Sequence, residues 1–246
     1  MNNNATLEKM KDLRLGGMVR AYRTILDDPI DKELSQEELI AHLIDTEWDE
    51  RKNRKYNRLM RNAKFRYNAV FEQIDYHLKR NLKKETILKL SDCQWIRKHN
   101  NIIITGSTGS GKSFLASALG HQACLFEFKV AYFNCMKLTG LLKESLADGS
   151  YEKEIRKILK SDLLILDDFG LSPFDSRSRL NLLEIMEDRH GLKSTIIVSQ
   201  LPVKNWHTVI GDKTIADAIC DRIVHTAVRI ELDPKDSLRK KKKNVD

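Results

Sequence analysis

The sequence has little proline, little glycine and no long hydrophobic run. Its 246 residues include four prolines and eleven glycines, which argues against a fibrous or low-complexity protein. The longest apolar runs are four residues, far below the ~20 needed to cross a bilayer. No basic and apolar leader follows Met1, so we expect a cytoplasmic protein without a signal peptide or a membrane partner.

Cysteine is also scarce, and its spacing argues against two kinds of site. The seven histidines do not stand at metal-ligand spacing with each other or with the cysteines, and no Cys-x-x-Cys pair occurs. We therefore expect reduced, mostly buried cysteines, with neither a disulfide nor a zinc centre. The four cysteines are Cys93, Cys124, Cys135 and Cys220.

Acidic residues are sparse in one segment, which dominates the charge of the chain. The net charge is +8, yet residues 51–89 alone carry thirteen Lys and Arg and three acids. A second basic run occupies 239–243. Localised positive charge of this kind is typical of proteins that bind a polyanion such as nucleic acid.

The first 68 residues have the pattern of a small all-α domain. Apolar spacing over 7–22 predicts one helix, and a capping box at Ser35 and Glu38 begins a second. The second helix places an apolar stripe, which includes Ile40, Ile44 and Trp48, beside a basic one. We interpret 1–68 as a DNA-binding and oligomerisation domain, although most charge runs are simply solvated surface. The candidate DNA contacts are Arg51, Arg54, Lys55, Arg58, Arg61, Lys64 and Arg66.

A phosphate-binding loop is the most specific motif in the chain. Residues 106–113 read G-S-T-G-S-G-K-S, between an apolar run and a helical pattern that aims its N-terminus at an anion. Backbone N–H groups would line a nest for phosphate, Lys112 would add a positive charge, and the Ser113 hydroxyl can complete a Mg²⁺ shell. The alternative is a chance match in a loop that binds no nucleotide. The predicted ATP-binding residues are Gly106, Ser107, Thr108, Gly109, Ser110, Gly111, Lys112, Ser113 and Phe114.

Short apolar runs alternate with helical patterns from about residue 70 onward. This alternation predicts an α/β domain over 69–246 with a central parallel five-stranded sheet covered on both faces. Ligands of such sheets bind at the carboxyl ends of the strands, where the P-loop lies. The predicted strands are 102–105, 130–134, 163–167, 195–199 and 227–232.

The third of these strands ends in two acids, 55 residues after Lys112. Asp167 is placed to hold Mg²⁺ beside Ser113, and Asp168 to orient or deprotonate the attacking water. An ordinary strand that ends in a solvated turn is the alternative, which the nearby P-loop makes the weaker one.

Two further positions carry polar residues suited to a γ-phosphate. Ser199 and Gln200 end the strand expected between the P-loop strand and the acidic strand, so either could sense that phosphate or simply begin a polar loop. Arg222 lies on a predicted helix, either paired at the surface with Asp217 or Asp221 or serving a neighbouring subunit as an arginine finger.

Together these residues resemble the IstB-type helper ATPases of insertion-sequence transposition, relatives of the DnaC helicase loaders within the AAA+ ATPases. The P-loop and the acidic strand indicate only an NTPase. The narrower likeness covers most of the chain and depends on its other segments. These are 13–18, 58–64, 95–102, Asp-Asp-Phe-Gly-Leu at 167–171, Ser-Gln-Leu-Pro at 199–202, and 237–239.

The resemblance implies an AAA+ fold with ATP and Mg²⁺ held between subunits of an oligomer. It implies that Arg222 is the arginine finger acting in trans and that Ser199 or Gln200 is the sensor. It also implies ATP-dependent assembly on double-stranded DNA with little sequence preference, and delivery of that DNA to a partner transposase.

Two departures from the family pattern change these expectations. Most AAA+ ATPases carry Glu where this chain has Asp168, whose carboxylate is one methylene shorter, so we expect slow, partner-stimulated hydrolysis. Only fourteen residues follow Leu232, so we expect the C-terminal helical lid to be reduced or absent. Arg239 either replaces a residue of that lid or belongs to the basic tail.

Other functions stay open at this point. A helicase loader would share nearly all of these features, and a DNA-binding module that keeps nucleotide without hydrolysing it would share many. A recombinase is disfavoured, because it would need separated carboxylates that hold two metals about 4 Å apart.

Overall fold

A computed structural model describes residues 3–27, 35–77, 80–225 and 227–233, which fall into two compact units, 1–58 and 59–246. Each unit is described here by itself. The units reflect packing, and the assignment of functions to 1–68 and 69–246 stays a prediction. The basic run 239–243, with Arg239, and the expected reduction of the lid lie outside the described residues.

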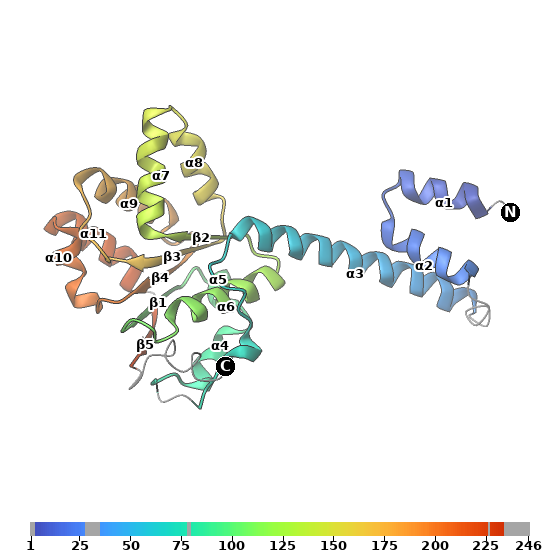
Figure 1. Ribbon diagram of the computed structural model, residues 1–246, viewed down its shortest axis with the longest axis horizontal. Helices are drawn as coiled ribbons and strands as arrows, with labels where there is room; N and C mark the ends of the chain where they lie inside the picture. Colours follow the sequence, from blue (N-terminus) through green and yellow to red (C-terminus); the bar gives the residue numbers. More distant parts are fainter. Residues whose placement is uncertain (1–2, 28–34, 78–79, 226, 234–246) are drawn as a thin grey trace, which may run out of the picture. The chain divides into compact units, whose positions relative to one another are not determined.

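Helices and strands alternate through the larger unit, as the sequence predicts (Figure 1). The strands are β1 (Asn101–Gly106), β2 (Val130–Asn134), β3 (Leu163–Phe169), β4 (Ser194–Ser199) and β5 (Ala227–Leu232). The helices are α1 (Asn3–Asp12), α2 (Gly16–Asp27), α3 (Gln36–Ala63), α4 (Lys84–Leu90), α5 (Gln94–Arg97), α6 (Lys112–Leu125), α7 (Cys135–Ala147), α8 (Tyr151–Leu159), α9 (Ser176–Arg189), α10 (Trp206–Ile210) and α11 (Lys213–Val224), with short 3-10 turns at Phe71–Gln73 and Val203–Asn205.

The five strands form one parallel sheet in the order β2-β3-β4-β1-β5. This confirms the predicted sheet and places β4 between the P-loop strand β1 and the acidic strand β3. All six residues of β4 and the first five of both β1 and β3 are buried, which explains why these strands are continuous apolar runs. All carboxyl ends therefore meet at one edge of the sheet.

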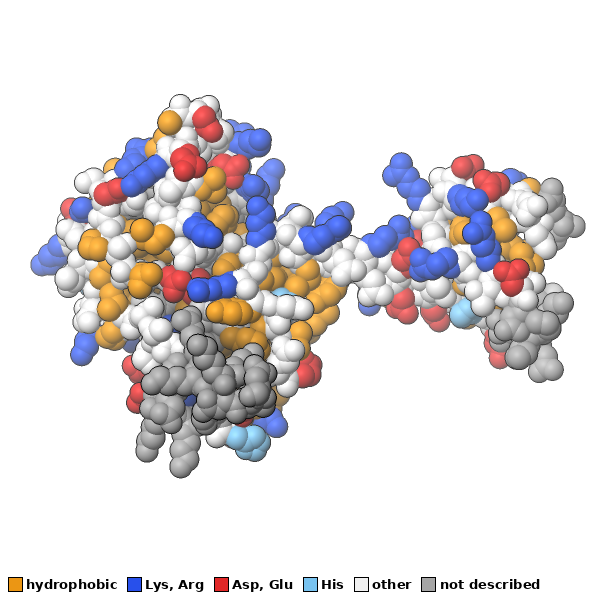
Figure 2. All heavy atoms as spheres, in the orientation of Figure 1, with side chains coloured by type: hydrophobic (Ala, Val, Ile, Leu, Met, Phe, Trp, Pro, Cys, Tyr) orange, Lys and Arg blue, Asp and Glu red, His pale blue; other side chains and the backbone are white. Residues whose placement is uncertain are grey.

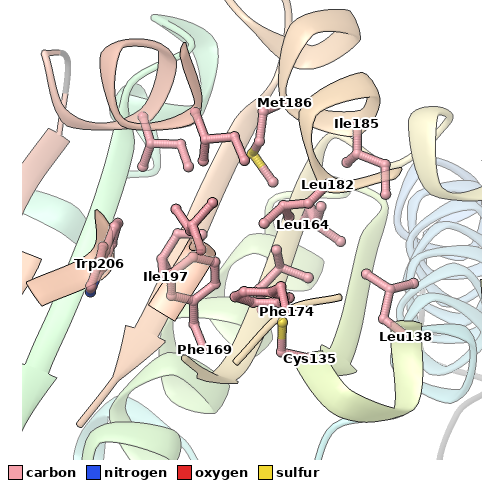
Figure 3. Packing of buried hydrophobic residues seen from close by; sticks show 14 of the residues in the cluster. Cys135, Leu138, Leu164, Phe169, Phe174, Leu182, Ile185, Met186, Ile197 and Trp206 are labelled. Atoms are coloured by element: carbon pink, nitrogen blue, oxygen red, sulfur yellow. The ribbon is translucent and has the colours of Figure 1, made fainter. Parts of the chain in front are cut away.

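Helices cover the sheet on both faces: α7 to α11 lie on one, and α6 lies on the other (Figure 1). Side chains from α7, α9, α11 and the sheet form one apolar core around Trp206, Phe169 and Ile197 (Figure 3). Cys93, Cys124 and Cys135 are buried and Cys220 is half-buried, all as free thiols. Across the described ranges, every helix is too short or too polar to cross a membrane.

The smaller unit corrects one prediction from the sequence. The segment 7–22 is not one helix but two, α1 and α2, because Arg14 adopts a left-handed backbone with φ 58°. The Glu47 carboxylate of α3 accepts the Gly17 and Met18 N–H groups at 2.7 and 3.3 Å, which caps the start of α2. The α2–α3 contact is therefore built on a buried acid as well as on apolar packing.

Helix α3 begins where the capping box predicts. The Ser35 N–H donates to Glu38 Oε2 at 2.8 Å, and the Glu38 N–H donates to Ser35 Oγ at 3.2 Å. The apolar stripe does not face a core: Ile40, Ile44 and Trp48 are 57%, 52% and 59% exposed. Basic side chains are spaced along the same helix (Figure 2).

Candidate functional site

The P-loop joins β1 to α6 at the carboxyl edge of the sheet. Gly106 has φ +147°, and a Cβ there would clash with the carbonyl oxygen of Leu232 on the neighbouring strand β5. Only glycine fits this close approach, so the first glycine of the motif fixes where the loop leaves the sheet. Lys112 is 7% exposed, and its Nζ donates to the Ser107 carbonyl at 2.7 Å, back across its own loop.

A buried arginine braces the same loop. Arg80 is 4% exposed, and its guanidinium donates to the Ser110 carbonyl at 3.2 Å and to the Asp75 carbonyl at 3.1 Å. Burial lowers the pKa of Arg80 from its ordinary value. This contact ties the segment before α4 to the phosphate-binding loop.

Asp167 and Asp168 lie in a β-bulge between β3 and β4. Leu166 pairs with Ile197 and Phe169 with Ser199, so two residues of β3 oppose one of β4. Asp168 has a left-handed backbone with φ 58°. Neighbouring residues of a regular strand point to opposite faces, and the bulge instead directs both carboxylates to the same side.

Asp167 is fully buried and accepts hydrogen bonds from α6 and from β2. Its Oδ1 accepts from Ser113 Oγ of the P-loop helix at 2.9 Å, and its Oδ2 accepts from the Tyr132 hydroxyl of β2. Burial and the neighbouring Asp167 raise the pKa of Tyr132. Asp168 Oδ2 accepts from Asn134 Nδ2 of β2 at 2.9 Å. The acidic pair is therefore held in place from both sides.

Arg66 also belongs to this site. Its NH1 atom lies 3.2 Å from Asp167 Oδ2 and 3.0 Å from Asp168 Oδ2. Burial alone would lower the pKa of Arg66, but Tyr67, Asp167 and Asp168 outweigh burial and raise it. The sequence places Arg66 among the DNA contacts, whereas in the structure its guanidinium pairs with the acidic residues of the nucleotide site.

The arrangement fits a nucleotide with a magnesium ion. The Ser113 hydroxyl and the Asp167 carboxylate converge within 2.9 Å, and hydroxyl and carboxylate oxygens are the hard ligands that Mg²⁺ prefers. The P-loop passes over the N-terminus of α6, where free N–H groups and the helix dipole favour an anion. The residues present therefore suit both the phosphates and the ion.

The structure separates the two sensor candidates by what they touch. Gln200 Oε1 accepts from Thr108 Oγ1 of the P-loop at 2.7 Å. Ser199 is fully buried, and its hydroxyl donates to the Phe169 carbonyl at 2.8 Å and accepts the Leu201 N–H. Gln200 thus contacts the phosphate-binding loop, while Ser199 closes the turn after β4; their roles stay predictions.

Arg222 lies in the last turn of α11, remote in sequence from the P-loop of its own chain. Its guanidinium pairs with Glu187 of α9 and donates to the Ala218 carbonyl at 2.9 Å. The sequence suggests Asp217 or Asp221 as its surface partner, but the structure gives Glu187. Its side chain keeps 25% exposure, and its role as a finger acting in trans stays a prediction.

Apart from Arg66, the predicted DNA contacts fall into two groups. Arg51 and Arg54 pair with the capping residue Glu47 at 2.6 and 3.4 Å, which gives them a structural task. Others lie on or just after the C-terminal part of α3, among the basic side chains visible along that helix in Figure 2. Those with exposed side chains are Arg58, Arg61 and Lys64, and Lys55 is half-buried.

Three site residues were missed by sequence reasoning. Tyr132 and Asn134 stand two apart on β2, a spacing that puts both on the face of Asp167, and this signal was available in the alternation of the strand. The sequence carries no such signal for Arg80, because it lies in a basic segment where a buried arginine cannot be told from an exposed one.

The chain is similar to proteins of insertion sequences over nearly its whole length. The sequence model of a family described as IstB-like ATP binding protein matches residues 8–245. An insertion sequence ATP-binding protein of Sinorhizobium fredii is 43% identical over 96% of this chain and 96% of its own length. That of IS1162 from Pseudomonas fluorescens is 38% identical, with 82% of this chain and 88% of that protein covered.

Solved structures of replication proteins share the fold. The DnaC helicase loader is 21% identical with a TM-score of 0.56, over 68% of this chain and 97% of that chain. AMPPCP-bound DnaA from Aquifex aeolicus is 20% identical with a TM-score of 0.59, over 74% and 57%. At this identity the likeness concerns the fold, an AAA+ P-loop sheet.

Proposed function

Because this chain belongs to the family of IstB-like ATP-binding proteins, we propose that it assembles on double-stranded DNA when ATP is bound and recruits a partner transposase. The family makes it an AAA+ ATPase that acts in insertion-sequence transposition. DNA binding, self-assembly and recruitment are the further steps of the proposal.

The observation that carries the proposal is the convergence of two motifs that lie far apart in sequence. Ser113 of the P-loop and Asp167 of β3 meet at 2.9 Å, with Asp168 beside them on the same side of the sheet. Helix α3 of the same chain carries a run of basic residues. Together, the nucleotide site and these residues support the proposal that bound nucleotide controls DNA binding.

The chain's own residues divide the work of ATP hydrolysis. P-loop N–H groups and Lys112 hold the phosphates, and Ser113 and Asp167 would hold Mg²⁺. The bound ion would neutralise charge on the β- and γ-phosphates. Asp168, fixed by Asn134, orients or deprotonates the attacking water, and its short side chain makes hydrolysis slow.

Assembly completes the site in this proposal. Arg222 reaches the γ-phosphate of a neighbouring subunit, as an arginine finger does, once it exchanges Glu187 for that phosphate. Gln200 reports the state of the phosphate through Thr108. The helicase-loader alternative draws on a likeness of fold alone, whereas relatives matched over their whole length come from insertion sequences.

The test combines duplex DNA with a slowly hydrolysed ATP analogue. Lys112→Ala should lose ATP-dependent assembly in electron micrographs and in fluorescence anisotropy of labelled DNA, while Lys153→Ala, an exposed lysine of α8, keeps both. Arg58→Gln with Arg61→Gln should weaken DNA binding and reduce its salt slope by about 2, because fewer counterions are released. Unchanged assembly by folded Lys112→Ala would contradict the proposal.

A further inference from the structure

Arg66 forms ion pairs with both acidic residues of the nucleotide site. Its NH1 atom lies 3.2 and 3.0 Å from carboxylate oxygens of Asp167 and Asp168. Asp167 is fully buried, and its other donors, the Ser113 and Tyr132 hydroxyls and the Asp168 N–H, are neutral groups. Among the described residues, Arg66 is the cation that pairs with both acids.

Two aromatic anchors hold the segment that carries Arg66. Phe65 packs against His121 with ring centroids 4.7 Å apart, and a Cβ on Gly120 of α6 would overlap the Phe65 ring. On the other side the Tyr67 ring lies 6.4 Å from Phe114, the residue that follows the P-loop. The packing of these two rings therefore holds the backbone of Arg66 next to Asp167 and Asp168.

The guanidinium and a magnesium ion would compete for one carboxylate, that of Asp167, whose Oδ2 bonds to Arg66 and whose Oδ1 bonds to Ser113. Asp167 is the carboxylate that would hold Mg²⁺ beside Ser113, and Arg66 already bonds to it. Two cations at one carboxylate repel each other strongly in a poorly solvated site. Arg66 keeps 40% side-chain exposure, so it has solvent to move into when an ion arrives.

We propose that Arg66 is a built-in counter-ion of the acidic pair, which Mg²⁺ must displace when nucleotide loads. The inference deepens the nucleotide site of the proposed function and says nothing about DNA. Arg66 thereby sets how much magnesium the site requires. It competes with the metal for the acidic pair and does not act on the phosphate.

Magnesium titrations of nucleotide binding test this without hydrolysis. With a fluorescent ADP analogue and no DNA, Arg66→Gln should reach half-maximal binding at roughly tenfold less Mg²⁺ than the unaltered protein, because the competing charge is gone. Arg66→Lys should fall between the two. Arg156→Gln, an exposed arginine of α8 with the same loss of charge, should match the unaltered protein.

Thermal unfolding without nucleotide gives a second readout. In Arg66→Gln the buried Asp167 lacks its cation, so Mg²⁺ should raise the melting temperature of this variant more than that of the unaltered protein. An equal or higher magnesium requirement in folded Arg66→Gln, or an equal melting shift, would overturn the proposal. Both measurements omit DNA, so the DNA-assembly proposal stands or falls separately.

Discussion

The two ends of the parallel sheet each hold an arginine among polar groups, but by different chemistry. At the carboxyl end, Arg66 is 40% exposed in its side chain and pairs with two carboxylates. At the amino end, Arg189 is 1% exposed and donates to neutral oxygens. Its partners are the carbonyls of Ile158, Ser161 and Ser194 and the hydroxyls of Ser161 and Thr195.

The acceptors explain what each end can do. Carbonyl oxygens of α8, of the segment just before β3 and of the start of β4 cannot change charge, so the Arg189 cluster joins these parts in one arrangement. Burial lowers the pKa of Arg189 to about 10, and five hydrogen bonds still keep its charge satisfied. Carboxylates can exchange one cation for another, so the Arg66 cluster can be rearranged. The amino end of the sheet therefore has a fixed set of polar partners, and the carboxyl end has partners that can bind a different cation.

Arg189→Met should have the largest effect on stability. The substitution keeps much of the volume but removes the five hydrogen bonds that Arg189 donates to buried oxygens, so we expect a loss of about 3 kcal/mol in the free energy of unfolding. Urea unfolding followed by circular dichroism measures it. Arg156→Met, which breaks only the exposed pair with Glu152 at 3.5 Å, should cost less than about 0.5 kcal/mol. Equal losses would show that the buried hydrogen bonds of Arg189 do not stabilise the amino end of the sheet.

Asp167→Asn should lower the rate of ATP hydrolysis strongly and change the free energy of unfolding little. We expect ATP hydrolysis to fall about 100-fold, equivalent to about 2.7 kcal/mol, because the charge that holds the metal is lost. The free energy of unfolding should change by less than about 1 kcal/mol, since the amide keeps the shape and removes a buried charge. Steady-state hydrolysis and urea unfolding decide it. A stability loss as large as that of Arg189→Met would show that the carboxyl end is equally rigid.

Asp162→Asn should produce a smaller, pH-dependent loss at the amino end. Burial alone would raise the pKa of Asp162, but hydrogen bonds from Lys193 Nζ at 2.6 Å and the Lys129 N–H at 2.9 Å outweigh it and lower the pKa. The stabilisation is therefore present above an unfolded-state pKa of about 3.9 and lost as pH falls through the folded-state value.

We expect Asp162→Asn to lose about 1 kcal/mol at pH 7, with a difference that shrinks towards about pH 2. Urea unfolding across this range measures it. Glu152→Gln, from the exposed pair with Arg156, should change stability by less than about 0.5 kcal/mol at any pH. A constant difference for Asp162→Asn would mean that its carboxylate charge is not what stabilises the fold.

The sequence predicted those features that depend on local pattern. Apolar runs predicted all five strands, and the P-loop spacing predicted the turn from β1 to α6. The place of β4 between β1 and β3 was also expected, because a P-loop sheet allows few arrangements, whereas the full strand order came from the structure. Gln200 beside Thr108 and Ser113 beside Asp167 are consequences of that order.

The remaining features depend on contacts that no local pattern encodes. Arg66 looks like one more arginine in a basic run, and only the packing of Phe65 on α6 directs it to the acids. The break in 7–22 required Glu47, thirty residues from Gly17, to cap α2. The sequence gives the number and positions of the charged residues. Only the fold determines which residue each of them pairs with.

The left-handed backbone at Asp168 constrains how this position can drift over evolutionary time. Asp and Asn tolerate φ near 58° better than longer side chains, so a single change to the glutamate of other AAA+ proteins would meet about 1 kcal/mol of backbone strain. A change to glutamate is therefore easier when the bulge changes with it. Lineages that share this bulge have a backbone reason to keep a short acid at this position.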